Sequence, residues 1–235
     1  MKTTTILAVS AFAATSMATV FPTGPHAANN FIPFGAGVAG GTPTMHQVFA
    51  SSLFSAATGG LPANITGIAF APSTNLTYNL GQVTINLGYT SRIPGVASGS
   101  GGLSIPTVGG GGGPNASGAM STFYSNAATS FTFTGASSSN FQMGFNGSFV
   151  YDPNQGNLLV EIVVPSAANL TLAVSRAAGS AESSRAYSGM RFAAGESPTT
   201  ATRMDFTFTP VPEPATLAVL GCGALALLRR RRRSA

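Results

Sequence analysis

The sequence predicts an all-β protein, an antiparallel β-sandwich of the jelly-roll type, with a signal helix before it and a single short transmembrane helix after it. Apolar and small polar residues alternate along many short stretches, which is typical of strands with one buried face. The 235 residues include 29 glycines and 15 prolines, and both residue types weaken helix interiors. Between its two ends, the sequence shows no helical period of useful length.

The N-terminal residues have the pattern of a secretory signal peptide. Met1-Lys2 gives a short positive start, and Ile6 to Ala14 form a compact apolar stretch that is too short to span a membrane. Ser16-Met17-Ala18 then places small residues at the −3 and −1 positions of a signal peptidase site. We therefore expect residues 1–18 to be a signal peptide that is cleaved after Ala18, following delivery to the Sec translocon. The alternative is a buried N-terminal helix.

The body, residues 19–209, is expected to contain about eight to ten short strands. Val83-Thr84-Ile85-Asn86-Leu87 shows the alternation most clearly. The run at 158–164 is more continuously apolar, which predicts a central strand covered on both faces. The expected strands are residues 64–71, 83–87, 130–134, 141–151, 158–164 and 205–209, with weaker candidates at 170–174 and 189–192.

A glycine-rich loop is expected at residues 98–118. Glycines occupy positions 99, 101, 102, 109 to 113 and 118. Such a composition predicts a mobile connection between two halves of one sandwich, in place of a boundary between domains. A phosphate-binding loop is excluded because no Gly-Lys-Ser/Thr sequence follows and no helix begins there.

Asp152-Pro153-Asn154 predicts a turn, because proline fixes φ and Asp or Asn side chains bond to nearby backbone N–H groups. Gly156 can then adopt a positive φ before the next strand. A calcium loop is the alternative, since Asp152, Asn154 and Asn157 all offer oxygen atoms. A single carboxylate is poor for calcium, so the turn is favoured.

The C-terminal segment, residues 210–235, has three parts in a fixed order. Pro212, Glu213 and Pro214 come first, and residues 215–228 follow without a charge. Those 14 residues would cover about 21 Å as a helix, short of the roughly 30 Å hydrocarbon core. The five arginines Arg229, Arg230, Arg231, Arg232 and Arg233 then stop translocation and stay in the cytoplasm. A short transmembrane helix of this kind is a weak anchor.

With these residues the chain resembles the PEP-CTERM family of exported proteins in Gram-negative bacteria. The resemblance implies recognition by an exosortase, a membrane-embedded enzyme that cuts near Pro212-Glu213-Pro214, so that this chain is the substrate. It also implies transient anchoring in the inner membrane, then a place on the cell surface or in the extracellular matrix. Exopolysaccharide is the further partner that the resemblance suggests. Cys222 superficially fits a lipobox, but a lipobox belongs in an N-terminal signal, so we expect Cys222 to pack within the tail helix.

A second resemblance covers part of the body. His46-Gln47-Val48-Phe49, Ile65 to Phe70 and Phe149 to Pro153 are similar to segments of an ectodomain common among PEP-CTERM proteins. That ectodomain type has no settled biochemical activity.

The net charge of +5 does not predict nucleic-acid binding. Lys2 and the C-terminal arginine run hold the excess, whereas the body has five arginines and five acids, and 5 − 5 leaves it neutral. A neutral body offers no electrostatic footprint for a phosphate backbone. The single cysteine excludes an intrachain disulfide, so burial and backbone pairing must stabilise the fold.

The body offers little for catalysis. It holds two histidines, His26 and His46, and no serine in a Gly-x-Ser-x-Gly context. We expect His46 to make a structural polar contact and Glu161 to face outward or to pair with an arginine such as Arg191. Two distant histidines are a poor metal site. We therefore expect no catalytic residue, no metal and no cofactor.

These patterns favour an exported, exosortase-sorted structural protein of the cell surface or biofilm matrix without catalytic activity. The alternative is a carbohydrate-binding, lectin-like surface module. A chain without tryptophan and with only five tyrosines has few of the aromatic platforms that lectin sites use. A secreted hydrolase is the third hypothesis.

Overall fold

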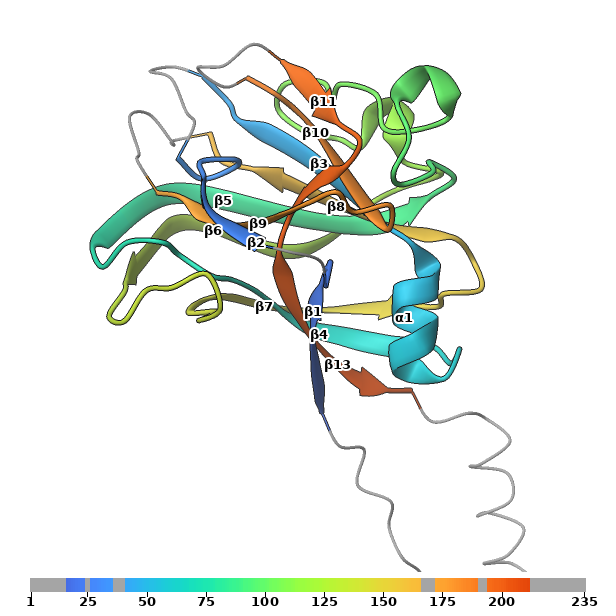
Figure 1. Ribbon diagram of the computed structural model, residues 1–235, viewed down its shortest axis with the longest axis horizontal. Helices are drawn as coiled ribbons and strands as arrows, with labels where there is room; N and C mark the ends of the chain where they lie inside the picture. Colours follow the sequence, from blue (N-terminus) through green and yellow to red (C-terminus); the bar gives the residue numbers. More distant parts are fainter. Residues whose placement is uncertain (1–15, 24–25, 36–40, 166–171, 190–193, 212–235) are drawn as a thin grey trace, which may run out of the picture.

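The computed structural model describes residues 16–23, 26–35, 41–165, 172–189 and 194–211 (Figure 1). The helices expected near the start of the chain and at 215–228 lie outside these residues. In the described part, no helix has the length and apolar character needed to cross a membrane.

The described strands form three sheets, and all their pairings are antiparallel. The four-stranded sheet has the order β1 (Met17–Phe21), β13 (Met204–Pro210), β4 (Ala63–Phe70), β7 (Met143–Tyr151). The six-stranded sheet has the order β11 (Gly195–Ser197), β10 (Ser183–Ser188), β3 (Thr44–Phe49), β8 (Asn157–Val163), β5 (Thr77–Thr90), β6 (Ser121–Thr132). The three-stranded sheet has the order β12 (Thr200–Thr202), β9 (Val174–Ala178), β2 (His26–Asn30).

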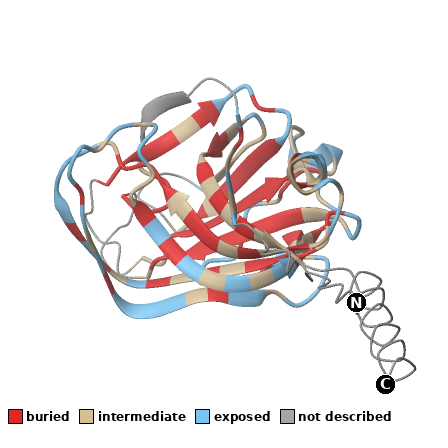
Figure 2. Ribbon diagram, turned by 90° about the horizontal axis from the view of Figure 1, so that it is seen from below, coloured by how far each residue is buried: buried red, intermediate tan, exposed pale blue. Residues whose placement is uncertain are grey.

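The two larger sheets enclose one hydrophobic core (Figure 2). Aromatic pairs join them across the core: Phe49 of β3 lies 5.2 Å from Phe206 of β13, measured between ring centroids. Tyr89 of β5 lies 5.5 Å from Tyr151 of β7 in the same way. The antiparallel all-β class that the sequence predicts is confirmed, and two sheets around one core fit a sandwich. The jelly-roll connectivity stays a prediction.

The strongly alternating segments became strands. The expected strands at 83–87 and 205–209 lie within β5 and β13. Those at 64–71, 141–151 and 158–164 match β4, β7 and β8 to within two residues at each end, and 130–134 overlaps the end of β6. Of the candidate at 170–174, residues 172 and 173 are not in a strand and Val174 begins β9, whereas 170 and 171 lie outside the described residues. Of the candidate at 189–192, Gly189 is not in a strand and 190–192 lie outside the described residues. The strand β10 was missed because its Ser, Arg and Ala residues give no apolar alternation, although five of its six residues are buried.

One helix corrects the expectation that the body has no helical segment. α1 (Ser51–Thr58) spans about two turns, too few to show a helical period. Its Phe54 ring packs at 4.9 Å from Tyr151 and 5.3 Å from Phe206, which fixes the helix over the end of the core. Gly59 ends the helix with a φ of +68°, a conformation that glycine adopts without strain.

Strand β8 is covered on both faces, as its continuous apolar sequence predicts. It lies between β3 and β5, and Leu158, Val160 and Ile162 point into the core between the sheets. Leu159 lies on the opposite face in a second cluster with Leu103, Ala116 and Met120. The glycine-rich loop supplies that outer cover.

The expectation that residues 98–118 link two halves of the sandwich is wrong, and the expected mobility of this loop stays a prediction. The loop joins β5 to β6, which are neighbours in the same sheet. It folds back over the outer face of that sheet through two short 3-10 helices, Ser98–Ser100 and Gly113–Asn115. Hydrogen bonds hold it there.

Candidate functional site

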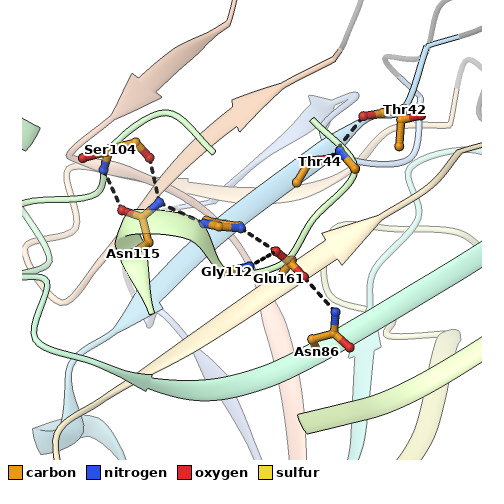
Figure 3. A network of polar contacts seen from close by, with 9 residues as sticks. Thr42, Thr44, Asn86, Ser104, Gly112, Asn115 and Glu161 are labelled. Atoms are coloured by element: carbon orange, nitrogen blue, oxygen red, sulfur yellow. Dashed lines mark hydrogen bonds and ion pairs between the residues drawn. The ribbon is translucent and has the colours of Figure 1, made fainter. Parts of the chain in front are cut away.

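A row of three polar side chains crosses the middle of the six-stranded sheet beneath the glycine-rich loop (Figure 3). Glu161 on β8 is the register partner of His46 on β3 and of Asn86 on β5. Directly opposed residues in antiparallel strands project from the same face, so the three side chains meet. His46 is 1% exposed and Glu161 is not exposed at all.

Both carboxylate oxygens of Glu161 accept hydrogen bonds. Oε2 accepts from His46 Nε2 at 2.8 Å and from the backbone N–H of Gly112 at 2.7 Å, and Oε1 accepts from Asn86 Nδ2 at 2.7 Å. Burial alone would raise the pKa of Glu161, but these donors favour the charged form and lower its pKa to about 2. Glu161 is therefore an ionised carboxylate held entirely by the protein.

The hydrogen bonds also fix the tautomer of His46. The side chain of Asn115 accepts from the backbone N–H of Ser104 and donates to the Ser104 carbonyl, both at 2.8 Å, so its oxygen and nitrogen are assigned. Its Nδ2 group lies 2.9 Å from His46 Nδ1. An amide nitrogen can only donate, so Nδ1 must be the acceptor and Nε2 must carry the proton. His46 is thus a neutral imidazole that donates to Glu161.

The loop reaches the carboxylate through its run of glycines. Gly109 to Gly113 all have positive φ, and the Gly112 N–H within this run donates to Glu161. Gly109 N–H donates to Thr44 Oγ1 at 3.0 Å, which ties the start of this run to β3. A Cβ at Gly110 would lie 2.8 Å from Val163, and one at Gly112 would lie 2.8 Å from the Ala116 side chain. Glycine is therefore needed here for both conformation and space.

The structure corrects the expectation for Glu161 and agrees with the expectation for His46. Glu161 neither faces solvent nor pairs with an arginine among the described residues, and Arg191 lies outside them. His46 does make a buried polar contact, and its partner is Glu161. Asn86, Asn115 and Gly112 were missed by sequence reasoning, because nothing local marks residues that meet only after the loop folds over the sheet.

The buried cluster is suited to holding the loop in place. Every polar atom discussed has a hydrogen-bond partner, and the loop covers the carboxylate. Across the described residues, no group of three or more His, Cys, Asp or Glu side chains is arranged to hold a metal ion. The arrangement acts as a noncovalent cross-link between a long loop and the centre of a sheet.

Acid should weaken this cross-link. The folded-state pKa of Glu161, about 2, lies below its usual 4.5, so the unfolded chain binds the proton more readily. The stabilisation is complete above about pH 4.5 and is lost as the pH falls through about 2. This stabilisation is on the order of 3 kcal/mol.

We therefore expect Glu161→Gln to be less stable than the wild type at neutral pH, with the gap closing by about 3 kcal/mol on acidification. Urea unfolding of both proteins at neutral pH and near the acid limit measures the gap. Glu182→Gln, which removes an exposed carboxylate, is the matched control. A gap that stays constant with pH would contradict the assignment of a low pKa to Glu161.

The turn at Asp152 forms as expected. Asp152 Oδ1 accepts from the backbone N–H of Asn154 at 2.9 Å, and this bond is the main reason that the pKa of Asp152 is lowered. Gly156 has a φ of +139° before β8 begins. Asn154 Nδ2 also donates to Asp152 Oδ1, so the Asn154 side chain presents its nitrogen, and not its oxygen, to the Asp152 carboxylate.

The predicted signal peptide ends within β1, the predicted tail begins at the end of β13, and these two strands pair with each other. Ala18 lies in β1 opposite Thr207 of β13, and a cut after Ala18 would leave residues 19–21 of β1 in the sheet. Phe21, at the end of β1, packs against Phe54 with ring centroids 5.0 Å apart. Pro212, Glu213, Pro214 and Arg229 to Arg233 lie outside the described residues. The last described residue, Val211, donates its N–H to the Pro62 carbonyl at 3.2 Å.

Comparisons with known proteins identify the C-terminal segment. The family model described as the PEP-CTERM protein-sorting motif matches residues 210–233. No curated protein and no solved structure was found to match the chain. The matched residues begin at the end of β13, so the motif follows directly from the folded body. The chain therefore carries a PEP-CTERM protein-sorting motif, the signal of an exported protein that is anchored transiently in the membrane and processed by an exosortase.

Proposed function

We propose that this protein is a structural component of the cell surface or extracellular matrix of a Gram-negative bacterium, without catalytic activity. The observation that carries the proposal is the sorting motif at residues 210–233, joined without a linker to the last strand of an all-β body. In this proposal the Sec translocon exports the chain, the tail holds it in the inner membrane, and an exosortase removes the tail. The body then joins an exopolysaccharide-rich matrix.

The body supports a passive role. Its buried acid, Glu161, and the neutral His46 are committed to anchoring the glycine-rich loop, so neither is available to a substrate. A matrix protein must also keep its fold outside the cell, and this body has no cysteine with which to form a disulfide. The buried polar cross-link and the large aromatic core take that place.

Mass spectrometry of the termini tests the proposal on protein recovered from the native cell surface. We expect an N-terminus near Thr19, a C-terminus close to residues 211–214, and no peptide from 215–235. Recovery of the intact tail through Arg233 would contradict it, because the protein would then be a permanently anchored membrane protein. Deletion of the exosortase from the same strain is the control, and it should restore the full tail.

A further inference from the structure

A second polar cluster lies where the three-stranded sheet packs against the end of the six-stranded sheet. Arg185 of β10 is 5% exposed. Within the described part of the chain, its guanidinium makes one hydrogen bond, from Nη1 to Thr202 Oγ1 of β12 at 3.3 Å. Its Nε atom is buried without any hydrogen-bond partner there. A buried N–H of this kind is costly, because it has lost water without regaining a hydrogen bond.

Arg176 brings a second guanidinium to the same place. It lies on β9 opposite Thr202, so its side chain leaves the small sheet on the face that carries the Thr202 hydroxyl. Its Nε atom is likewise buried and unpaired in the described structure. Burial lowers the pKa of Arg185 to about 10, and the positive charge of Arg176 adds to this effect against an opposing influence of Tyr187. The two cations are therefore close enough to repel each other.

A neighbouring side chain holds this geometry in place. Gln47 on β3 is the register partner of Arg185 and projects from the same face of the large sheet. Its amide donates to the Thr202 carbonyl at 2.7 Å and accepts from the Thr202 N–H at 2.8 Å. Thr202 is thus fixed by its backbone, and its hydroxyl is set beside Arg185.

No carboxylate of the body compensates these charges. The body has five acids: Asp152, Glu161, Glu182, Glu196 and Asp205. Of its described residues, only His46 and Glu161 are within ion-pair distance of each other, and the body segments that are not described contain no Asp or Glu. Glu196 of β11 lies next to the register partner of Arg185. It is itself opposite Ala186, and its carboxylate accepts a hydrogen bond from the Ser98 N–H. None of the five acids of the body therefore pairs with Arg176 or Arg185.

We propose that Arg176 and Arg185 form a binding site for an oxyanion, a carboxylate or sulfate group of the kind that acidic polysaccharides carry. Each guanidinium presents parallel N–H donors in a planar fork, which matches two oxygens of such a group. The unused Nε–H groups of both arginines would find acceptors in the oxygens of that group. The anion would also remove the repulsion between the two cations. This proposal does not depend on tail processing, so its failure would leave the sorting proposal intact.

The test is calorimetric titration of the full chain, solubilised in an uncharged detergent, with sodium glucuronate and separately with sodium sulfate. Sodium chloride at equal ionic strength is the reference. We expect saturable binding of at least one oxyanion by the wild type, and the preferred probe distinguishes a carboxylate from a sulfate source. Arg176→Gln should weaken that binding by about tenfold or more. Arg92→Gln is the matched control, because the Arg92 guanidinium already donates to the Pro114 carbonyl.

Arg185→Gln is the second variant, and it should lose binding in the same way. If it does not fold, the half-buried Arg176 decides the question alone. The proposal is overturned if neither oxyanion binds beyond the chloride reference, or if Arg176→Gln binds as well as Arg92→Gln. Binding that is lost in Arg176→Gln and kept in Arg92→Gln supports it.

Discussion

Glu161→Ala is expected to lower the free energy of unfolding by about 3–5 kcal/mol, because it leaves several buried donors without an acceptor and opens a cavity. The loss has two sources. The imidazole N–H of His46, the amide of Asn86 and the backbone N–H of Gly112 would each be buried without an acceptor. The missing side chain would also leave a cavity under the loop.

Equilibrium unfolding in urea, followed by tyrosine fluorescence, measures this effect on the full chain in an uncharged detergent. The chain has no tryptophan, and all five tyrosines lie in the body, so the signal reports the body and not the tail. Glu182→Ala removes an exposed carboxylate and should change the stability by less than about 0.5 kcal/mol. Similar losses of unfolding free energy in Glu161→Ala and Glu182→Ala would show that the buried network stabilises the fold no more than an exposed carboxylate does.

Glu213→Ala is expected to abolish release of the protein from the membrane. The sorting motif implies processing by an exosortase, and Glu213 is the single acid of the motif, flanked by two prolines that remove backbone donors. Loss of that carboxylate should leave the full-length chain in the membrane fraction, with the folded body unchanged.

Immunoblotting of membrane and culture-medium fractions from the native host measures this outcome, with the intact mass confirming the tail. Glu196→Ala is the control, since it removes one carboxylate from β11 and leaves the tail untouched. Normal release of Glu213→Ala would mean that the central acid of the motif is not required for processing.

The parts of this molecule that the sequence predicted well are those set by neighbouring residues. The tail is a local pattern of a short motif, an apolar run and a basic cluster, and the comparison confirms the motif. The strand β8 is likewise encoded by its own continuous apolar residues, and it lies at the centre of its sheet with both faces covered.

The surroundings of Glu161 could not be predicted from neighbouring residues. Alternation along β8 correctly places Glu161 on the opposite face from Val160, but it does not show which residues cover that face. The face is covered by a loop 49 residues away in sequence, while the imidazole partner is 115 residues away. Composition alone cannot reveal that a glycine-rich segment folds back on a sheet, because glycine permits both mobile and tightly packed backbone.

The second cluster was hidden for a different reason. Arg176 and Arg185 lie on strands rich in Ser, Ala and Arg, a composition that resembles an exposed loop. Small side chains allow the three-stranded sheet to pack closely on the larger one, so that Arg185 is buried and Arg176 is half-buried. The resulting excess of buried positive charge is visible only once the two sheets are placed together.

The position of β13 has a mechanical consequence. Any attachment made through the C-terminal segment pulls on the end of this strand, and β13 lies between β1 and β4 (Figure 1). A force along the strand must therefore shear two antiparallel ladders at once, because the hydrogen bonds lie across the direction of the pull. A strand at the sheet edge has only one such ladder to resist the load. The C-terminal segment is thus attached to a strand that two neighbouring strands hold against a pulling force.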